Sequence, residues 1–493
     1  MNTLGIDIGS SSIKIAILDV ETGKRVAAVT LPETEMKIDA PQAGWAEQDP
    51  LMWWKYVSLA IPMAMKQAKL TPEEINAIGI TYQMHGLVCV DENNNLLRKS
   101  IIWCDSRAVE LGNEATVSIG IEKCLSHLLN APGNFTASKL AWVKKNEPEI
   151  YKHIAKIMLP GDFIALMLTG NATTTITGLS EGMFWDYLKQ APSTFLLEHF
   201  GFRPDLLSDI VPQFGIQGEL LEDVASHLGL KAGIPITYRA GDQPNNAFSL
   251  NVLNPGEVAA TAGTSGVVYG VSDQVKYDPQ SRVNTFVHVN HTKEEQRLGV
   301  LLCINGTGIL NSWMRNQVAG ELTYEEINQL ASTVAPGSNG VTILPFGNGA
   351  ERMLGNKEPG CIIAGMSFNR NSKADLLRAA QEGIAFAFKY GMNIMKETGI
   401  DLKVIRAGKA NLFLSPIFRD TLATITGVQI ELYDTDGALG AARGAAVGAG
   451  FYASFKDAFV DLKVLETIEP DKKNAAQLQI AYDKWVNLLE KNI

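Results

Sequence analysis

The pattern of apolar and polar positions predicts strands alternating with helices along the whole chain. The chain opens on two runs rich in β-branched residues, separated by Gly9 and three serines, which is typical of two strands joined by a tight polar turn. A third strand is expected at 25–31, a helix over 50–69 and a buried strand over 75–82. A second hairpin is predicted within 86–103, where three consecutive asparagines separate two apolar runs.

Helical periodicity dominates from about 105 to 230, and we expect this block to form an insertion or cap on the first sheet. Its helices are predicted over 138–146, 148–157, 161–169 and 218–229. The second half repeats the opening, because 257–270 again reads as a strand, a small polar turn and a strand. Helices are expected there over 323–334, 372–397, 415–426 and 438–454, with a short strand at 428–433.

The repeated opening predicts an α/β protein of two domains that duplicate one unit. A chain of 493 residues also exceeds the roughly 250–300 residues that one core organises. We place the boundary near residue 246, which gives domains 1–246 and 247–493. No Ser/Gly-rich linker separates them, so the halves are expected to meet closely around a cleft suited to a small molecule.

Composition narrows the classes of partner. The 43 Lys and Arg against 53 Asp and Glu give a net charge of −10, which argues against broad adhesion to nucleic acid or anionic lipid. No apolar stretch approaches the roughly 20 residues that span a bilayer, and the strand pattern begins by residue 3, without room for a signal sequence. A soluble cytoplasmic protein is expected. The cysteines are odd in number and widely spaced, which suits a reducing compartment: Cys89, Cys104, Cys124, Cys303 and Cys361.

Two small polar turns can bind phosphate. Asp7 precedes Gly9, Ser10 and Ser11 at a strand–turn–strand, so the segment is neither a Walker loop nor a dinucleotide fingerprint. Small residues nevertheless let backbone N–H groups approach phosphate oxygens, and Asp7 can hold magnesium through water. Alone, the turn reads more simply as an ordinary hairpin. A matching turn at 263–266 suggests that two such turns could grip a nucleotide from both sides.

Asp242 follows a predicted strand at 236–239, within Ala-Gly-Asp-Gln-Pro. The commoner role of a Gly-Asp pair is a turn or helix cap, and sequence alone favours that interpretation. The functional alternative is a general base that takes the proton from a hydroxyl attacking a γ-phosphoryl group.

Polar side chains also follow the buried strand at 75–82. Gln83, Met84 and His85 supply an amide, an apolar wall and an imidazole, which suit a sugar. A lone histidine is more often a core residue satisfied by the backbone. Trp103, Asp105 and Arg107 offer an aromatic ring, a carboxylate and a guanidinium, with a surface ion pair as the simpler interpretation. Tryptophans 45, 53 and 54 could stack on a sugar, although packing is their commoner role.

Together these segments resemble the FGGY family of carbohydrate kinases, and within it the xylulokinases, in order along essentially the whole chain. Gln-Met-His-Gly at 83–86 is the most telling of the matching segments. The other matching segments lie at 7–14, 44–54, 101–107, 135–142, 159–163, 241–243, 261–266, 344–352 and 375–383.

The resemblance implies two ribonuclease-H-like domains of the actin and hexokinase type around a central cleft, using ATP and Mg²⁺. Asp242 would be the general base and Asp7 would help to place magnesium. The implied sugar-binding residues are Gln83, Met84, His85, Trp103, Asp105, Arg107 and Gln243. The implied nucleotide-binding residues are Gly9, Ser10, Ser11, Gly263, Thr264, Gly308, Gly408 and Asn411.

Two segments depart from the family pattern. Lys409 and Ala410 stand in a turn that is usually a run of glycines, so a changed contact with the nucleotide is expected. The segment 173–181 lacks an aspartate that the family usually carries there, which would alter a substrate or cap contact.

The expected reaction is ATP-dependent phosphorylation of D-xylulose to D-xylulose 5-phosphate, with domain closure excluding water. The alternatives are a kinase for another ketose or polyol (ribulose, rhamnulose, glycerol) or a silent paralogue that binds sugar or nucleotide. An actin- or chaperone-like ATPase is a third class, which would leave the Gln-Met-His segment unexplained. A homodimer is suggested by family likeness alone.

Overall fold

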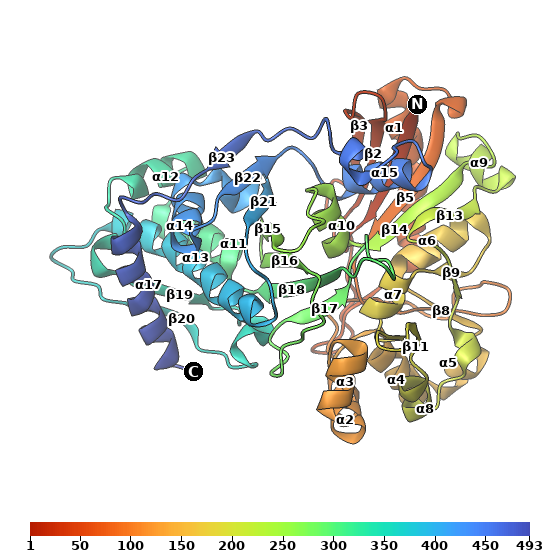
Figure 1. Ribbon diagram of the computed structural model, residues 1–493, viewed down its shortest axis with the longest axis horizontal. Helices are drawn as coiled ribbons and strands as arrows, with labels where there is room; N and C mark the ends of the chain where they lie inside the picture. Colours follow the sequence, from red (N-terminus) through yellow and green to blue (C-terminus); the bar gives the residue numbers. More distant parts are fainter. The chain divides into compact units, whose positions relative to one another are not determined.

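Figure 1 shows the computed structural model of the protein, which describes all residues from 1 to 493. The chain forms two compact units, and it passes between them more than once. The first unit contains Met1–Asn251, Phe286–Lys293 and Thr435–Leu462. The second unit contains Val252–Thr285, Glu294–Asp434 and Lys463–Ile493. The boundary predicted at residue 246 falls within helix α10 (Asp242–Ser249).

The first unit is built on a six-stranded sheet of order β13-β14-β5-β1-β2-β3. Its strands are β1 (Asn2–Ile8), β2 (Ile13–Asp19), β3 (Arg25–Leu31), β5 (Ile75–Tyr82), β13 (Phe214–Glu219) and β14 (Pro235–Gly241). β1, β2 and β3 are antiparallel neighbours, which confirms the predicted opening. β5 is parallel to both β1 and β14, and all three strands end level, because Tyr82 pairs with Ile8 and with Gly241. Whatever follows these strands therefore meets at one edge of the sheet.

The second unit repeats this plan in a seven-stranded sheet of order β17-β18-β16-β15-β21-β22-β23. Its strands are β15 (Glu257–Ala262), β16 (Gly266–Ser272), β17 (Asn284–Val287), β18 (Leu298–Ile304), β21 (Val404–Gly408), β22 (Ile430–Tyr433) and β23 (Glu466–Ile468). Three antiparallel strands, β18, β16 and β15, are again followed by two parallel additions, β21 and β22, and an antiparallel edge, β23. The duplication expected from the two polar turns is confirmed.

Helix α15 (Gly437–Gly448) comes late in the sequence but covers the sheet of the first unit, where Figure 1 draws it in blue beside β2 and β5. Its approach depends on paired glycines of β1 and β5. A methyl group on Gly5 would lie 1.9 Å from the Ala438 carbonyl oxygen, and one on Gly79 would lie 2.0 Å from that of Ala441. Because glycine has no side chain beyond a hydrogen atom, the backbone of α15 packs directly on the backbones of β1 and β5.

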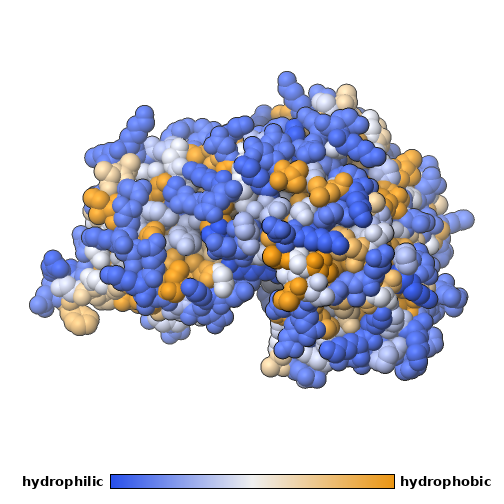
Figure 2. All heavy atoms as spheres, turned by 60° about the horizontal axis from the view of Figure 1, so that its bottom comes forward, coloured by the Kyte–Doolittle hydropathy of each residue, from blue (hydrophilic) through white to orange (hydrophobic).

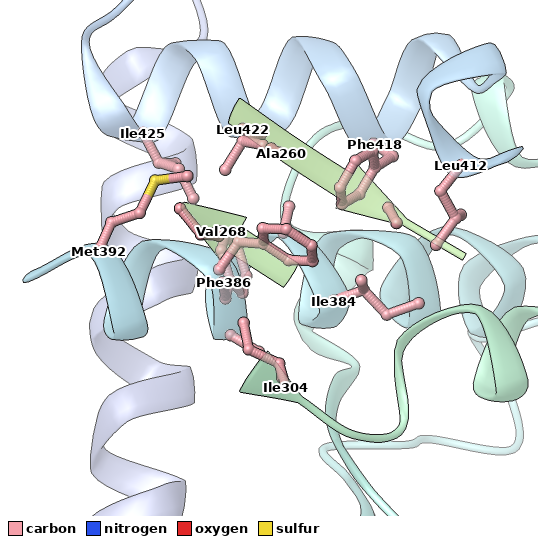
Figure 3. Packing of buried hydrophobic residues seen from close by; sticks show 14 of the residues in the cluster. Ala260, Val268, Ile304, Ile384, Phe386, Met392, Leu412, Phe418, Leu422 and Ile425 are labelled. Atoms are coloured by element: carbon pink, nitrogen blue, oxygen red, sulfur yellow. The ribbon is translucent and has the colours of Figure 1, made fainter. Parts of the chain in front are cut away.

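The helices of the second unit pack on each other and on its sheet. α13 (Lys373–Glu397) and α14 (Pro416–Thr426) face one another across the core that Figure 3 shows. Phe418 of α14 packs against Phe388 of α13 with ring centroids 5.5 Å apart, while Phe386 faces Tyr482 and Trp485. Leu422 of α14, Val268 of β16 and Ile304 of β18 belong to the same cluster, which Figure 3 shows. α12 (Tyr324–Ser332) and α17 (Ala475–Glu490) flank this pair.

Three sequence predictions in the first unit need correction. The hairpin predicted within 86–103 forms only in part: antiparallel bridges join Leu87 to Ile101 and Val90 to Leu96. The regular strand pairs of this segment are with distant partners, because β6 (Val88–Val90) pairs with β8 (Lys156–Met158) and β7 (Ser100–Ile101) pairs with β4 (Glu47–Gln48). The helix predicted over 148–157 ends at His153, before β8, and the helix predicted over 218–229 begins only at Glu222, after β13.

The remaining helices of the first unit agree with expectation in type. They are α1 (Pro50–Ala68), α2 (Val109–Ile119), α3 (Ile121–Leu128), α4 (Thr136–Asn146), α6 (Pro160–Thr169), α7 (Ile176–Glu181) and α8 (Thr194–Phe200). Hydrophilic side chains dominate the face of the molecule in Figure 2, with apolar residues scattered in small groups. None of the helices combines the length and the apolar character needed to cross a bilayer.

Candidate active site and nucleotide-binding loops

The candidate site lies at the edge of the first unit's sheet where β1, β5 and β14 end. The turn Gly9–Ser12 follows β1, Gln83–His85 follow β5, and Asp242 follows β14 as the first residue of α10. Polar groups at the carboxyl ends of adjacent parallel strands are a recurrent place for ligands in α/β sheets. The fold thus brings together the predicted base, the predicted metal ligand and the first predicted sugar-binding residues.

Asp242 has the properties of a general base. It is partly exposed, and desolvation, followed by the charge of Asp7, raises its pKa from 3.8 to about 7, while hydrogen bonds from Gln243 oppose that rise. A carboxyl that is half-ionised near neutral pH suits proton transfer from a hydroxyl. The helix-cap interpretation finds no support, because the residue at the N-cap position of α10 is Gly241.

Asp7 is the penultimate residue of the buried strand β1 and is almost fully buried. Burial raises its pKa to about 6, the charge of Asp436 adds to that rise, and Lys14, whose Nζ lies 3.7 Å from Oδ2, opposes it. The start of α15 is equally close, since a methyl group on Gly437 would lie 2.7 Å from Asp7 Oδ2. Asp7 and Asp242 are thus two desolvated carboxylates, and the charge of Asp7 raises the pKa of Asp242 further, so this edge of the sheet suits a divalent cation.

No cluster of three or more His, Cys, Asp or Glu side chains suitable for a metal ion exists in the chain. A kinase does not require one, because Mg²⁺ is usually held by one or two carboxylates together with substrate phosphates. Asp7, supported by Asp242, therefore fits Mg²⁺ held mainly by the nucleotide.

The turn of Gly9, Ser10 and Ser11 is anchored by its surroundings. The Gly9 N–H donates to the Ser12 carbonyl at 3.0 Å, which closes the turn. Gln48 Nε2 donates to the Ser10 carbonyl at 2.7 Å, and the half-exposed Trp103 reaches the Ser10 hydroxyl at 3.4 Å. Trp103 is thereby placed beside the turn predicted to bind phosphate.

The segment after β5 forms one wall of the site. Gln83 is buried, and its Nε2 donates to Gln48 Oε1 at 3.1 Å, while its own Oε1 has no hydrogen-bond partner. Met84 lies over the backbone that precedes Asp242, since a methyl group on Gly241 would be 2.6 Å from Met84 Cγ. The structure therefore joins the predicted sugar segment directly to the predicted base.

His85 is held in a left-handed conformation, with φ of 61°, which is uncommon for a residue with a side chain. Its ring packs edge-on against Phe135 with centroids 4.7 Å apart, and Phe286 lies on another side at 5.5 Å. Its Nδ1 hydrogen-bonds with the Glu181 carbonyl oxygen at 3.1 Å. His85 is partly exposed, so the imidazole remains accessible within an aromatic frame.

Lys139 of α4 is a residue of this region to which the sequence assigned no role. It is fully buried, and its Nζ donates to the His85 carbonyl oxygen at 2.7 Å, which braces the strained residue. Desolvation lowers its pKa to about 7, against the charge of Asp105. The signal that the sequence offered for Lys139 is its position in the Phe-Thr-Ala-Ser-Lys segment, which resembles the family.

Asp105 and Arg107 form a buried ion pair rather than the surface pair that was the simpler interpretation. Arg107 Nη2 lies 2.7 Å from Asp105 Oδ2, and Nη1 lies 2.7 Å from Glu47 Oε1. The guanidinium also stacks 3.8 Å from the ring of Trp45. These contacts order the loop after β7, and a direct role in sugar binding stays a prediction for both residues.

Four of the predicted nucleotide-binding residues of the second unit, Gly263, Thr264, Gly308 and Asn411, come together at the turn between β15 and β16, and Gly408 ends the adjacent strand β21. The Gly308 N–H, in helix α11 (Thr307–Trp313), donates to the Gly263 carbonyl at 3.0 Å, and the Ile309 N–H donates to that of Thr264 at 3.2 Å. Asn411 approaches the same turn, its Nδ2 lying 3.8 Å from a methyl group placed on Gly263. These hydrogen bonds fix the start of α11 against the turn, and the small residues Gly263 and Gly308 leave the surface there free of bulky side chains, which suits a phosphate or ribose.

The departure at Lys409 and Ala410 is accommodated by the backbone. Ala410 is extended, with φ of −152° and ψ of 166°, so no glycine is required there. The left-handed residue is Asn411, with φ of 53°. Lys409 points to the edge strand β23, where its Nζ lies 3.2 Å from Glu466 Oε2.

Comparison with known proteins identifies the class. Residues 2–249 match the N-terminal domain of the FGGY family of carbohydrate kinases, and residues 258–451 match its C-terminal domain. The chain therefore belongs to the FGGY family of carbohydrate kinases. It is an enzyme of the kinase class with the predicted fold of two actin- and hexokinase-like domains, and FGGY kinases use the predicted ATP and Mg²⁺.

Individual relatives have low sequence identity to this chain. A xylulose kinase of Escherichia coli K12 is 28% identical over 446 residues, covering 89% of this chain and 88% of the relative. The crystal structure of xylulose kinase from Rhodospirillum rubrum has a TM-score of 0.89 at 23% identity, covering 100% of this chain and 99% of that one. A gluconate kinase from Lactobacillus acidophilus reaches 0.90 at 21% identity, covering 99% and 98%. Likeness at this level establishes the fold and leaves the sugar open.

Proposed function

We propose that the protein transfers the γ-phosphoryl group of ATP to the terminal hydroxyl of D-xylulose, giving D-xylulose 5-phosphate and ADP. The observation that carries the proposal is Asp242, a carboxyl with a pKa of about 7 beside the Met84 and His85 wall. The choice of D-xylulose is supported by the Gln-Met-His-Gly segment at 83–86 and by similarity to the xylulose kinase of E. coli.

In this mechanism Asp242 accepts the hydroxyl proton as the sugar oxygen attacks the γ-phosphorus. A bond from sugar oxygen to phosphorus forms, the bond to the β–γ bridging oxygen breaks, and ADP leaves with the electron pair. Little covalent chemistry is asked of the protein, so positioning dominates. Partial exposure lets Asp242 return its proton to solvent after each turnover.

Asp7 would hold Mg²⁺ at the sheet edge, with Asp242 next to it. When bound, the cation offsets negative charge on the phosphates. The N–H groups and hydroxyls of the Gly9–Ser11 turn would bind phosphate oxygens beside it. In the second unit, Gly263, Thr264, Gly308, Gly408 and Asn411 would contact the nucleotide.

The sugar would lie against Met84 and His85, within reach of Gln83, Trp103 and Gln243. The unpartnered Gln83 Oε1 is a buried acceptor that a sugar hydroxyl can satisfy. Homodimer formation and a cytoplasmic location remain predictions.

The test is ADP formation with a panel of D-xylulose, D-ribulose, L-rhamnulose and glycerol, followed by isolation of the phosphorylated product. We expect the highest kcat/KM with D-xylulose. A higher kcat/KM with another member of the panel would replace the substrate but keep the reaction. ADP formation that is the same with and without sugar would contradict the proposal and favour an ATPase or a silent paralogue.

A further inference from the structure

Glu181 is a buried acidic side chain that the mechanism above does not use. It is the last residue of α7 and is 2% exposed. It forms no salt bridge; the hydroxyl of Tyr82 faces it, and its Oε1 makes no hydrogen bond of normal geometry. Leaving a buried polar atom unpaired is costly, so such an atom in a folded protein calls for an explanation.

Two other buried carboxylates have a positively charged partner, which Glu181 lacks. Asp162 lies 3.2 Å from the Arg239 guanidinium. Glu382 is as buried as Glu181, at 2% exposure, and accepts from Arg378 Nε at 2.7 Å and from the Ser338 hydroxyl at 2.7 Å. At both positions, the buried carboxylate that stabilises the fold is paired with an arginine, unlike Glu181.

The Glu181 side chain is directed at the candidate sugar site. A methyl group on Gly241, which directly precedes Asp242, would lie 2.6 Å from Glu181 Oε2 and equally close to Met84 Cγ. The backbone of Glu181 bonds with the ring of His85. Glu181 is thus framed by the base, the apolar wall and the imidazole of one site.

The residues around Glu181 also determine whether its carboxyl is protonated. Desolvation raises the pKa of Glu181 well above its ordinary value, and the charges of Asp242 and Asp162 add to the rise. A protonated carboxyl carries one O–H donor and one carbonyl acceptor. This pair complements a hydroxyl group, which also donates and accepts.

We propose that Glu181 is a specificity-determining residue of the sugar site, whose carboxyl hydrogen-bonds with a hydroxyl of a neutral ketose next to the one that is phosphorylated. The inference rests on the proposed function, which places the sugar beside Asp242, Met84 and His85. A site built to bind a hydroxyl discriminates strongly against analogues that lack it, because its own polar group is then left unpaired.

The experiment replaces Glu181 by methionine, which keeps the volume and removes both hydrogen-bonding atoms. We expect kcat/KM for D-xylulose to fall by roughly tenfold or more, as on loss of a buried hydrogen bond to substrate. The KM for ATP should change less than about twofold, and the melting temperature should stay the same or rise, because an unpaired polar group is gone. Glu181→Gln, which retains a donor and an acceptor, should recover most of the activity.

Glu382→Met is the matched control, since it makes the same change at an equally buried glutamate that is fully partnered. It should lower the melting temperature, because Arg378 and Ser338 lose their acceptor, and should leave the KM for D-xylulose unchanged. If Glu181→Met behaved like Glu382→Met, Glu181 would be a structural residue and the inference would be wrong.

Monodeoxy analogues of D-xylulose identify the hydroxyl. One analogue should be a markedly poorer substrate than D-xylulose for the wild type and an equal one for Glu181→Met, which is the signature of a direct contact in a double-mutant cycle. The absence of such coupling for every analogue overturns the inference. If the wild type prefers another ketose, the proposed substrate fails, and the same cycle on that sugar and its deoxy analogues still tests Glu181.

Discussion

The pH dependence of the reaction provides the most direct test of Asp242. Its pKa of about 7 is set by desolvation and by the charge of Asp7. A base must be deprotonated to act, so activity should rise with pH through this pKa. From the ionised fraction, kcat/KM at pH 7 should be about half its plateau, and at pH 6 about tenfold below it.

Asp7 adds a second feature to the profile. Its pKa of about 6 means that below pH 6 two carboxylates become protonated rather than one. The logarithm of kcat/KM should therefore fall with a slope near one between pH 7 and 6 and steepen towards two below that. An ordinary aspartate would instead leave activity flat down to about pH 5, given its usual pKa near 4.

The assay measures kcat/KM at limiting sugar and limiting MgATP, so that the profile reports the free enzyme. Asp242→Asn should lower turnover by roughly 10²-fold or more and remove the limb near pH 7 from the residual activity. Asp242→Asn with near wild-type turnover, or a wild-type profile that is flat from pH 8 to 5, would refute the assignment of Asp242 as the base.

The same pKa predicts the sign of a stability effect. The pKa of Asp242 is higher in the folded protein, about 7, than its ordinary 3.8. The folded state therefore binds the proton more tightly, and stability falls as pH rises from about 4 to about 7. Asn cannot ionise, so Asp242→Asn should gain stability relative to wild type across this range, with an upper limit of about 4 kcal/mol. Urea unfolding at pH 4 and pH 8 measures the difference.

Three further outcomes follow from the geometry. Lys409→Gly combined with Ala410→Gly should raise the KM for ATP a few-fold and leave the KM for sugar unaltered, because two glycines loosen an ordered turn. A change in the KM for sugar alone would place this turn away from the nucleotide. Gly308→Ala should raise the KM for ATP, because its methyl group would lie 2.0 Å from the Gly263 carbonyl oxygen and part the two loops; an unchanged KM contradicts nucleotide binding there. Gly241→Ala should raise the KM for sugar but not for ATP, since its methyl group would displace side chains of the sugar wall; equal effects on both would point to general disruption.

Much of the fold could be predicted because its signals are local. The β-branched runs and polar turns of β1–β2 and β15–β16 are read within about 15 residues. Asp242 could be singled out for a similar reason, since it directly follows a strand in a Gly-Asp pair. The proposal that Asp242 is a base rather than a helix cap draws on the structure, because desolvation and proximity to Asp7 have no local signature.

Other features depend on contacts between distant segments. The segment expected as a hairpin at 86–103 keeps only two bridges between its own runs, while β6 and β7 form strand pairs with 156–158 and 47–48, which sequence reasoning did not foresee. The attachment of α15 to the first unit depends on Gly5 and Gly79, which are paired only once β1 and β5 are parallel neighbours. Glu181 shows no sequence signal of function, because its role is inferred from its surroundings, to which the distant Gly241, Met84 and His85 contribute.

The acidic residues of the candidate site depend on the rigidity of the sheet edge that carries them. Asp7, Glu181 and Asp242 are desolvated acids whose pKa values are all raised, so each is disfavoured in its charged form. A flexible edge would relax and hydrate them. The close backbone packing of α15 on β1 and β5 keeps that edge rigid, and the level ends of three parallel strands fix the spacing between the groups. The most closely packed part of the unit therefore keeps these acids desolvated, and replacing them by side chains without their hydrogen-bonding or acid–base groups should lower activity without lowering stability.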